Sequence, residues 1–330
     1  MKTLKIFIFT HNDLDGVGCG VIGKLYFPDA YVQYCSYDNI DDTLLYFLSR
    51  NKKNLKNFRI IISDIYYKHD NSDITEMLRM AGELIICDHH TTSTWLKNIV
   101  FQHNSIINII PDSDVCGTLL LYKSLESLYK NKIKNISIIK INNFIENVNR
   151  WDVWQWVKYL PETNNVEEMK DAINHNMSFT LNGAVYFYGI ENFVNKMLMY
   201  FHDFIDFDDI VSEKLVEFNT KQIESLSNYK VWHYVYASVQ YGEIPYAMIK
   251  LNSPNISLAS ILCKSAMRDE DKFLAIYIDE DKDAVSLRCN VEGIDLSVIA
   301  KECEGGGHKD AAGCKRSVLC NHSDSKILNN

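Results

Sequence analysis

The sequence lacks several patterns that would assign it to a common class. None of its nine cysteines stands in a CxxC pair, and no run approaches the roughly 20 apolar residues of a membrane-spanning helix. It also lacks a basic excess, because 34 Lys and Arg residues face 43 Asp and Glu residues and give a net charge of −9. These absences argue against membrane partners and against a protein that coats long nucleic acid by charge.

The N-terminal apolar run is not expected to be a secretion signal. The apolar run Ile6–Phe9 ends at polar residues without a small-residue cleavage site, so it is interpreted as a strand. Cys87 and Cys289 stand in apolar runs, as buried thiols do, and a reducing, cytoplasmic location fits them. Near the C-terminus stand Cys314, Cys320 and His322. They could form a zinc site, or they could be three residues without a shared role.

What the chain does contain is enough apolar sequence for two domains, with 330 residues of which 47% are hydrophobic. In the first half, β-branched or aromatic runs alternate with amphipathic stretches, which predicts a parallel sheet covered on both faces. The predicted strands are Ile6–Phe9, Tyr31–Tyr37, Arg59–Ser63, Glu83–Cys87 and Ile106–Ile110.

The remainder of the chain has a different texture. Residues 164–229 show helical spacing without strand-like runs, and strand-like runs return after residue 230. We therefore predict an α/β protein with a parallel-sheet domain at 1–163 and a helical connector at 164–229. A smaller α+β domain follows at 230–320, and residues 321–330 form a tail.

Three of the predicted strands end in acidic and histidine residues. The first strand, Ile6–Phe9, is followed by His11, Asp13 and Asp15. The strand Arg59–Ser63 is followed by Asp64. The strand Glu83–Cys87 is followed by Asp88, His89 and His90. Ligands of open α/β sheets bind beyond the carboxyl ends of the strands, so these side chains should converge. Four ionised carboxylates in one small volume require cations, and this mixture of oxygen and imidazole donors favours manganese or magnesium.

A simpler explanation exists for part of this pattern. Asp13 or Asp15 could do no more than cap the helix that begins near Gly16. Adjacent histidines such as His89 and His90 are also common on surface loops. The coincidence of three such strand ends favours a shared site over three independent caps.

These motifs resemble those of the DHH phosphoesterases, whose name matches Asp88-His89-His90. The first motif is similar to His11-Asn12-Asp13-Leu14-Asp15-Gly16, the second to Ser63-Asp64, and a fourth to the segment around Asp152. The C-terminal segment Gly305-Gly306-Gly307-His308 resembles the DHH-associated substrate-binding domain. The resemblance covers residues 1–160 and 230–318 and leaves the helical middle unexplained.

The resemblance implies a hydrolase with two divalent metal ions, manganese first, with magnesium or cobalt as alternatives. One ion would be held by His11, Asp13 and Asp64. The second would be held by Asp15, Asp64, His89 and Asp152, with Asp64 as the bridge. Asp88 would then orient an imidazole, and His90 would face the phosphate as hydrogen-bond donor or acid.

Substrate binding is expected in the C-terminal domain. Three consecutive glycines let backbone N–H groups approach a phosphate closely, and a guanidinium pairs with phosphate oxygens. An alternative for Arg288 is a surface ion pair. The implied substrate-binding set, beside His90, is Arg288, Asn290, Gly305, Gly306, Gly307 and His308.

The favoured function is hydrolysis of short single-stranded oligonucleotides to nucleoside monophosphates, with a nucleic acid or small nucleotide as the binding partner. The alternatives are a single-strand DNA exonuclease, a cyclic-dinucleotide or nucleoside bisphosphate hydrolase, a pyrophosphate or polyphosphate hydrolase, and a catalytically silent nucleotide-binding protein. A homodimer is compatible with the sequence.

Overall fold

The computed structural model divides the chain into two compact units. One consists of Met1–Trp156 with Asn176–Leu215, and the other of Val157–His175 with Val216–Asn330. The structure describes residues 4–324 except 70, 102–104, 112–113, 131, 135, 157–167, 169–170, 174, 225–228, 252–265, 279–280, 290–292 and 322.

The first unit is built on a five-stranded sheet. Its strands are β1 (Lys5–His11), β2 (Tyr31–Cys35), β3 (Phe58–Ser63), β4 (Glu83–Asp88) and β5 (Ser105–Ile109). The helices in the first segment of this unit, up to Trp156, are α1 (Leu14–Tyr26), α2 (Ile40–Asn51), η1 (Lys52–Asn57), α3 (Ser72–Leu78), η2 (Thr91–Asn98), α4 (Gly117–Leu128) and α5 (Ile138–Asp152).

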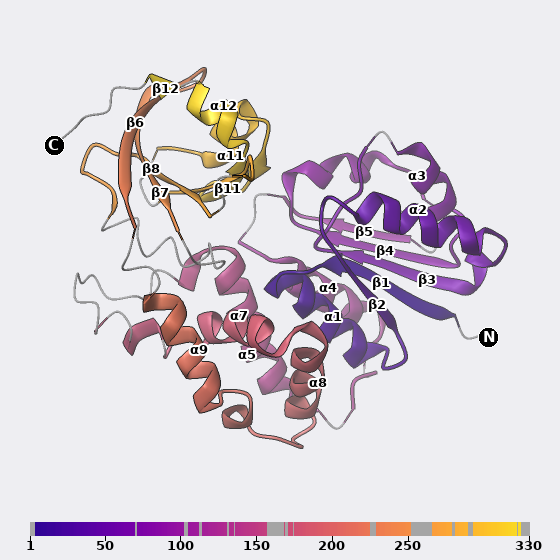
Figure 1. The fold of residues 1–330 in the computed structure, drawn as a ribbon. Helices are drawn as coiled ribbons and strands as arrows, with labels where there is room; N and C mark the ends of the chain where they lie inside the picture. Colours follow the sequence, from indigo (N-terminus) through magenta and orange to yellow (C-terminus); the bar gives the residue numbers. More distant parts are fainter. Residues whose placement is uncertain are drawn as a thin grey trace. The chain divides into compact units, whose positions relative to one another are not determined.

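All neighbouring strands of this sheet are parallel, in the order β2-β1-β3-β4-β5. In Figure 1, α2 and α3 cover one face of the sheet and α1 and α4 cover the other. Because both faces are covered, β3 is a continuous apolar run in which Ile60, Ile61 and Ile62 are all fully buried. The strand order reverses between β1 and β3, where doubly wound sheets bind their ligands.

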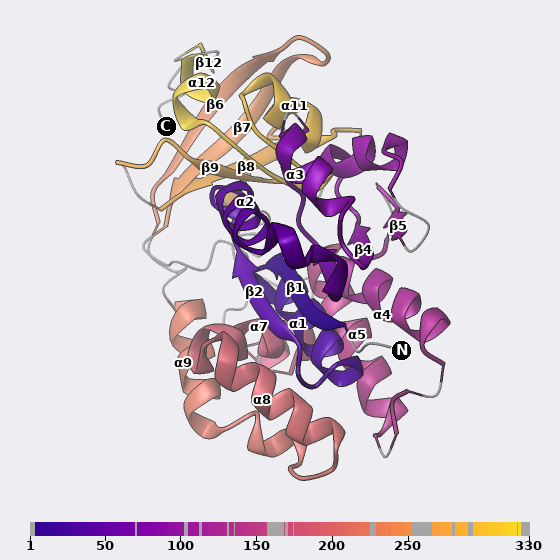
Figure 2. The same cartoon turned by 90° about the vertical axis from the view of Figure 1, so that its right-hand side faces the viewer.

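The middle of the chain is helical, as predicted. It contains α7 (Met177–Tyr188), α8 (Ile190–Phe201), η4 (Phe207–Asp209) and α9 (Glu213–Glu224). α7 packs against α5, and α8 packs against α1 and α7, as Figure 2 shows. These two helices therefore complete the core of the first unit, and the connector boundaries at 163 and 229 stay a prediction.

The second unit contains a seven-stranded mixed sheet in the order β10-β11-β9-β8-β7-β6-β12. Its elements are β6 (Val231–Ser238), β7 (Gly242–Lys250), β8 (Phe273–Tyr277), β9 (Val285–Arg288), α11 (Leu296–Glu302), β10 (Gly306–Gly307), β11 (Ala311–Cys314), α12 (Arg316–Asn321) and β12 (Ser323–Asp324). Within this sheet, only β7 and β8 pair in parallel among the described strands. The predicted α/β fold with an α+β C-terminal domain is confirmed, and the sheet of that domain is mixed.

The structure can also be compared with the predictions made from the cysteines and from hydropathy. Cys87 and Cys289 are buried, and all eight cysteines in the described part of the chain are free. Among the described helices, none is both long and apolar enough to cross a bilayer. The zinc alternative gains no support from the described residues, where no candidate metal group includes Cys314 or Cys320, and His322 lies outside them.

Candidate metal centre

The register of the sheet explains why the predicted residues meet. Thr10 of β1 pairs with Ser63 of β3, and Ser63 pairs with Cys87 of β4. The next residue of each strand is therefore at the same carboxyl edge, beside the β1/β3 reversal. These three neighbours are His11, Asp64 and Asp88.

The turn after β1 delivers two carboxylates in different ways. Asp13 is the N-cap of α1, and its Oδ1 accepts a hydrogen bond from the Gly16 backbone N–H at 3.0 Å. The other oxygen, Oδ2, lies 2.9 Å from His11 Nδ1. The turn requires glycine at position 16, because a Cβ there would lie 2.1 Å from the His11 carbonyl oxygen. Capping and membership of the cluster thus coexist in Asp13.

Asp15 has a second partner that the sequence did not reveal. Its carboxylate is buried and accepts backbone N–H groups from Gly117 and Thr118, at 2.6 and 2.8 Å. These are the first residues of α4, so a side chain of α1 satisfies the N-terminus of another helix. Gly117 allows this approach, since a Cβ there would lie 2.6 Å from the Asp64 Cβ.

Asp64 adopts a backbone conformation that is rare outside glycine. Its φ is +57°, in the left-handed region, and its N–H donates to the Cys87 carbonyl at 2.9 Å. Asp and Asn tolerate this region better than most residues, yet the conformation still carries strain. The turn aims the buried carboxylate of Asp64 at His89, with Oδ1 lying 3.2 Å from Nε2.

His89 is surrounded by three carboxylates. Besides Asp64, its Nε2 lies 3.7 Å from Asp15 Oδ2 and 3.6 Å from Asp152 Oδ2. Asp152 is the last residue of α5, so a helix far along the sequence reaches this strand end. Asn149, one turn earlier, accepts the Cys116 N–H through Oδ1 at 2.7 Å and thereby fixes the entrance to α4.

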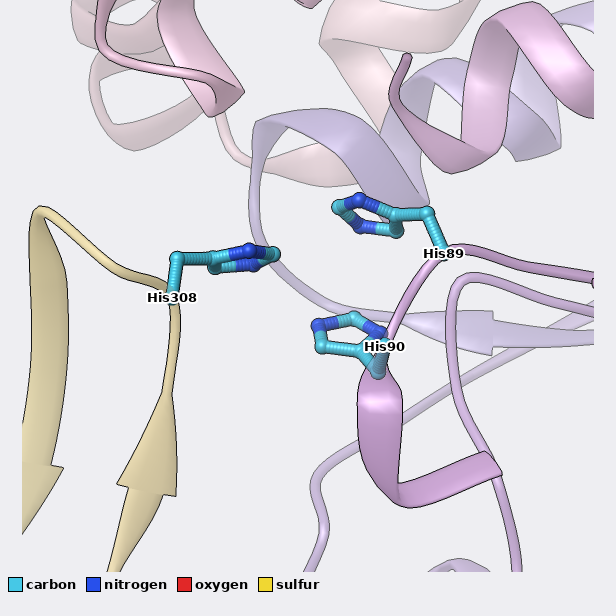
Figure 3. Close-up of side chains that lie close together, drawn as sticks. All are labelled: His89, His90 and His308. Atoms are coloured by element: carbon cyan, nitrogen blue, oxygen red, sulfur yellow. The ribbon is translucent and has the colours of Figure 1, made fainter. Parts of the chain in front are cut away.

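His90 follows on the same loop and is oriented by Asp88. Asp88 Oδ1 lies 2.7 Å from His90 Nδ1 and also accepts the His89 backbone N–H at 2.9 Å. Figure 3 shows the His89 and His90 rings beside each other, with their centroids 4.4 Å apart. The imidazole that Asp88 orients is thus that of His90.

Burial and the repulsion between carboxylates both shift pKa values in the cluster. Burial, followed by the neighbouring charges of Asp15 and Asp13, holds the pKa of Asp64 and of Asp152 well above the ordinary aspartate value. Burial opposes a charge on His90, but the charge and hydrogen bond of Asp88 prevail and raise its pKa to about 9. Burial and the charge of His90 lower the pKa of His89.

Several carboxylate oxygens here are short of partners. The Oδ2 atoms of Asp64, Asp88 and Asp152 are buried, and none has a hydrogen-bond partner among the described residues. A buried, unpartnered carboxylate oxygen is costly unless a cation binds it. Among the groups whose ligand atoms lie within 4.8 Å of one another are His11 with Asp13 and Asp64, Asp15 with His89 and Asp152, and a set formed by Asp64, Asp88, His89 and His90. The donor set therefore fits divalent metal ions.

The glycine motif of the second unit has a different character at each position. A Cβ on Gly305 would lie 2.0 Å from the Gly313 carbonyl oxygen, and one on Gly307, whose φ is +142°, would lie 2.5 Å from Ala312 Cα. A Cβ on Gly306 would meet nothing within 4 Å. Packing on β11 therefore explains two of the three glycines.

Arg288 stands near this motif within the second unit. It ends β9 and pairs with Ala311, whose carbonyl oxygen accepts the His308 backbone N–H at 2.7 Å. Arg288 is buried, and its Nη1 donates to the Leu287 carbonyl at 2.7 Å. The role of Arg288 stays a prediction, and Asn290 lies outside the described residues.

Family models decide the classification. The model of the DHH family N-terminal domain matches residues 5–145, and that of the DHHA1 domain matches residues 235–318. The chain belongs to the DHH phosphoesterase superfamily. The DHH motif of this phosphoesterase is Asp88-His89-His90 at the end of β4, and the helical middle lies between the two matched regions.

Several individual proteins are similar to the chain. The chain is similar to the oligoribonuclease NrnB of Bacillus subtilis, with 29% identity over 314 residues that span 93% of this chain and 72% of the relative. A solved DHH domain from a member of a family of ribosomal proteins shares the fold, with 12% identity, a TM-score of 0.57, and coverage of 96% and 85%. RecJ in complex with Mn²⁺ from Thermus thermophilus has 14% identity, a TM-score of 0.49, and coverage of 96% and 50%.

Proposed function

We propose that this DHH phosphoesterase hydrolyses short single-stranded oligonucleotides to nucleoside monophosphates with the help of two divalent metal ions. The observation that carries the proposal is the pair of ligand groups at the carboxyl edge of the first sheet, together with the unpartnered oxygens of Asp64 and Asp152. Hard carboxylate oxygens mixed with imidazole nitrogens favour manganese, with magnesium and cobalt as alternatives.

In this proposal His11, Asp13 and Asp64 hold one ion. Asp15, Asp64, His89 and Asp152 hold the other, and Asp64 serves both because its carboxylate lies 3.2 Å from His89 and within the His11 group. Such a pair of ions polarises a phosphoryl oxygen and lowers the pKa of bound water, so the protein needs no serine or cysteine nucleophile.

The remaining polar residues act on the substrate. Asp88 is fully buried and fixes the His90 ring through Nδ1. His90 is thereby held beside the proposed metal ligands, where it can bind a phosphate. In the second unit, we assign Arg288, His308 and the backbone of the Gly305–Gly307 segment to phosphate binding, because glycine permits close approach and guanidinium pairs with phosphate oxygens.

The choice of substrate rests on two supports. The curated relative that spans 93% of this chain is named an oligoribonuclease, and the net charge of −9 disfavours long duplexes held by charge. A short oligonucleotide meets both. The cytoplasmic location and a homodimeric state are further predictions that fit this function.

One substrate panel tests the proposal. Purified protein with Mn²⁺ is given di- to pentanucleotides of RNA and of DNA, long single-stranded DNA, a cyclic dinucleotide, a 3′,5′-bisphosphate and pyrophosphate, and released products are followed by chromatography. We expect nucleoside monophosphates from the short oligonucleotides at the highest kcat/KM. Intact di- to pentanucleotides would refute the proposal, and a better substrate elsewhere in the panel would identify one of the alternatives.

A matched pair of variants connects the activity to the site. Asp64→Asn removes a charge without new backbone strain, since Asn tolerates the left-handed region as Asp does. It should lower kcat/KM at least about 100-fold, because even residues behind the ligands of metal sites often cost 10–100-fold. Asp42→Asn, on the exposed side of α2, removes the same charge away from the cluster and should leave activity unchanged.

A further inference from the structure

Tyr37 lies beside the metal centre although it belongs to none of the four motifs. It follows β2, the edge strand next to β1, and His11 pairs with Cys35 across these two strands. The loop after β2 therefore reaches the same carboxyl edge as the turn after β1. Tyr37 is 38% exposed, so it stands at the outer side of the centre.

The Tyr37 hydroxyl continues the hydrogen-bond chain that begins at Asp88. Its oxygen lies 3.0 Å from His90 Nε2, while His90 Nδ1 lies 2.7 Å from Asp88 Oδ1. Both ring nitrogens of His90 thus have partners in the described structure. The chain leads outward, from a fully buried Asp88 through a His90 side chain that is 19% exposed to the more exposed Tyr37.

The Tyr37 ring is held in place by aromatic contacts. Its centroid lies 4.8 Å from that of His11 and 5.3 Å from that of Tyr66. The His90 ring meets it edge-on at 5.8 Å. Packing on three rings fixes the direction of the phenol, which reduces the entropic cost of using its hydroxyl.

Hydrogen-bond accounting shows what the chain can do. Asp88 is an acceptor, so the nitrogen facing it carries a hydrogen. The Tyr37 hydroxyl turns about its C–O bond, so it can direct its single hydrogen away from Nε2 when a stronger acceptor approaches. The phenolic hydrogen is then directed to an acceptor outside the chain, and a phosphate oxygen is such an acceptor.

We propose that the Tyr37 hydroxyl contacts a non-bridging oxygen of the scissile phosphodiester, and that His90 and Asp88 act behind it as positioning residues. This inference rests on the proposed function. It refines the assignment of His90, because Tyr37 would stand between His90 and the phosphate. The phenol, at the solvent side of the chain, is the group that an incoming phosphate meets first.

The test combines a variant with a substrate analogue. Tyr37→Phe keeps the ring and its packing and removes only the hydroxyl. We measure kcat and KM for a dinucleotide and for its two phosphorothioate diastereomers, each with sulfur in place of one non-bridging oxygen. We expect Tyr37→Phe to lower kcat/KM about 10-fold or more, and for one diastereomer the loss caused by sulfur should be smaller in the variant than in the wild type.

Controls separate this contact from a structural role. Tyr66→Phe loses a hydroxyl from a ring that packs on Tyr37, and it should stay within about twofold of the wild type. Mn²⁺ affinity and melting temperature of Tyr37→Phe should also stay close to those of the wild type. If packing against His11 were the whole role of Tyr37, removal of the hydroxyl would leave kcat/KM and the sulfur effect unchanged as well.

Each remaining outcome decides against the inference. Activity of Tyr37→Phe within twofold of the wild type would overturn it, as would a sulfur penalty that is equal in variant and wild type for both diastereomers. In both cases the wild type is active and the proposed function survives. A wild type that leaves every short oligonucleotide intact would instead refute the proposed function and this inference with it.

Discussion

At the scale of single residues, glycines show how packing and function can be separated. Gly305 and Gly307 are required by β11, which would collide with any Cβ at either position. Gly306 lies between them in β10 and faces open space. A segment of three identical residues therefore contains one position that packing does not explain.

Gly306→Ala tests that position. The new Cβ meets nothing within 4 Å, and Gly306 is not among the residues with positive φ. We expect a change in unfolding free energy below about 1 kcal/mol, measured by urea denaturation. If the Gly306 backbone approaches a phosphate, the methyl group should raise KM about 10-fold or more.

Gly305→Ala is the matched comparison. It should cost about 1–3 kcal/mol, because its Cβ would overlap the Gly313 carbonyl and force the strands apart. Equal stability of the two variants would contradict the packing argument. Wild-type KM in a folded Gly306→Ala protein would remove this glycine from the substrate contacts.

At the scale of elements, the candidate metal centre joins the starts of two helices. Asp13 caps its own helix, α1, whereas Asp15 accepts the first N–H groups of α4, about 100 residues later in the chain. Both helices begin at the sheet edge where the proposed ligands gather. The carboxylates that bind cations in the proposal therefore also hold the helix termini.

Asp15 variants measure that second role. Asp15→Asn and Asp15→Ala both remove the charge, but only Asn keeps an oxygen that can accept from Gly117 or Thr118. With a chelator present, we expect Ala to be less stable than Asn by about 1–3 kcal/mol, the cost of an unsatisfied buried N–H group. Chemical denaturation gives this difference, and equal midpoints and slopes would show that the capping bonds contribute nothing.

The sequence predicted the strands of the first sheet closely, because each buried parallel strand is a short apolar run. The convergence of His11, Asp64 and Asp88 also followed from the sequence, since all three continue strands of one parallel sheet. The roles of His11 and Asp64 as ligands, and of Asp88 as the residue that orients His90, are still proposals. Asp152 needed the family resemblance, because nothing local in an aromatic helix end indicates a metal ligand.

Other contacts could not be predicted from the sequence. The bonds from Asp15 to α4 depend on how two helices pack, and the role of Asn149 depends on the same loop. Tyr37 had a usable signal, because it follows β2, whose carboxyl end lies at the same edge of the sheet. A tyrosine in a turn, however, has no spacing that identifies a partner.

At the scale of the whole molecule, charge is divided unevenly. From the sequence, residues 1–163 hold 18 basic and 18 acidic side chains, and residues 164–229 hold 4 and 11. The acidic total therefore arises mainly outside the segment that carries the centre. Two divalent ions would give residues 1–163 a positive balance, which favours a phosphate substrate.

Stability of the metal-free protein should depend on pH in a direction set by the centre. The raised pKa values of Asp64 and Asp152 mean that folding retains protons that the unfolded chain releases above pH 4. His90 acts in the same direction between its ordinary value of 6.5 and about 9. The unfolded chain binds fewer protons there, so the free energy of unfolding falls as pH rises.

We therefore expect the melting temperature with a chelator to fall between pH 7 and 9. Mn²⁺ should raise it more at the upper end of this range, because metal ligands must lose their protons. Calorimetry at several pH values with chelator or Mn²⁺ gives both slopes. A chelated protein whose melting temperature rises over this range, or an equal Mn²⁺ effect throughout, would contradict the expectation.

The helix contacts of Asp13 and Asp15, together with their proposed binding of metal, have a consequence for how descendants of this protein can be interpreted. A descendant that lost its chemistry would still need both carboxylates to begin α1 and α4, so drift would spare them. Asp152, whose Oδ2 supports no hydrogen bond among the described residues, would be released first. An intact Asp-x-Asp motif is thus a weak sign of an active descendant, whereas retention of Asp152 is a stronger one.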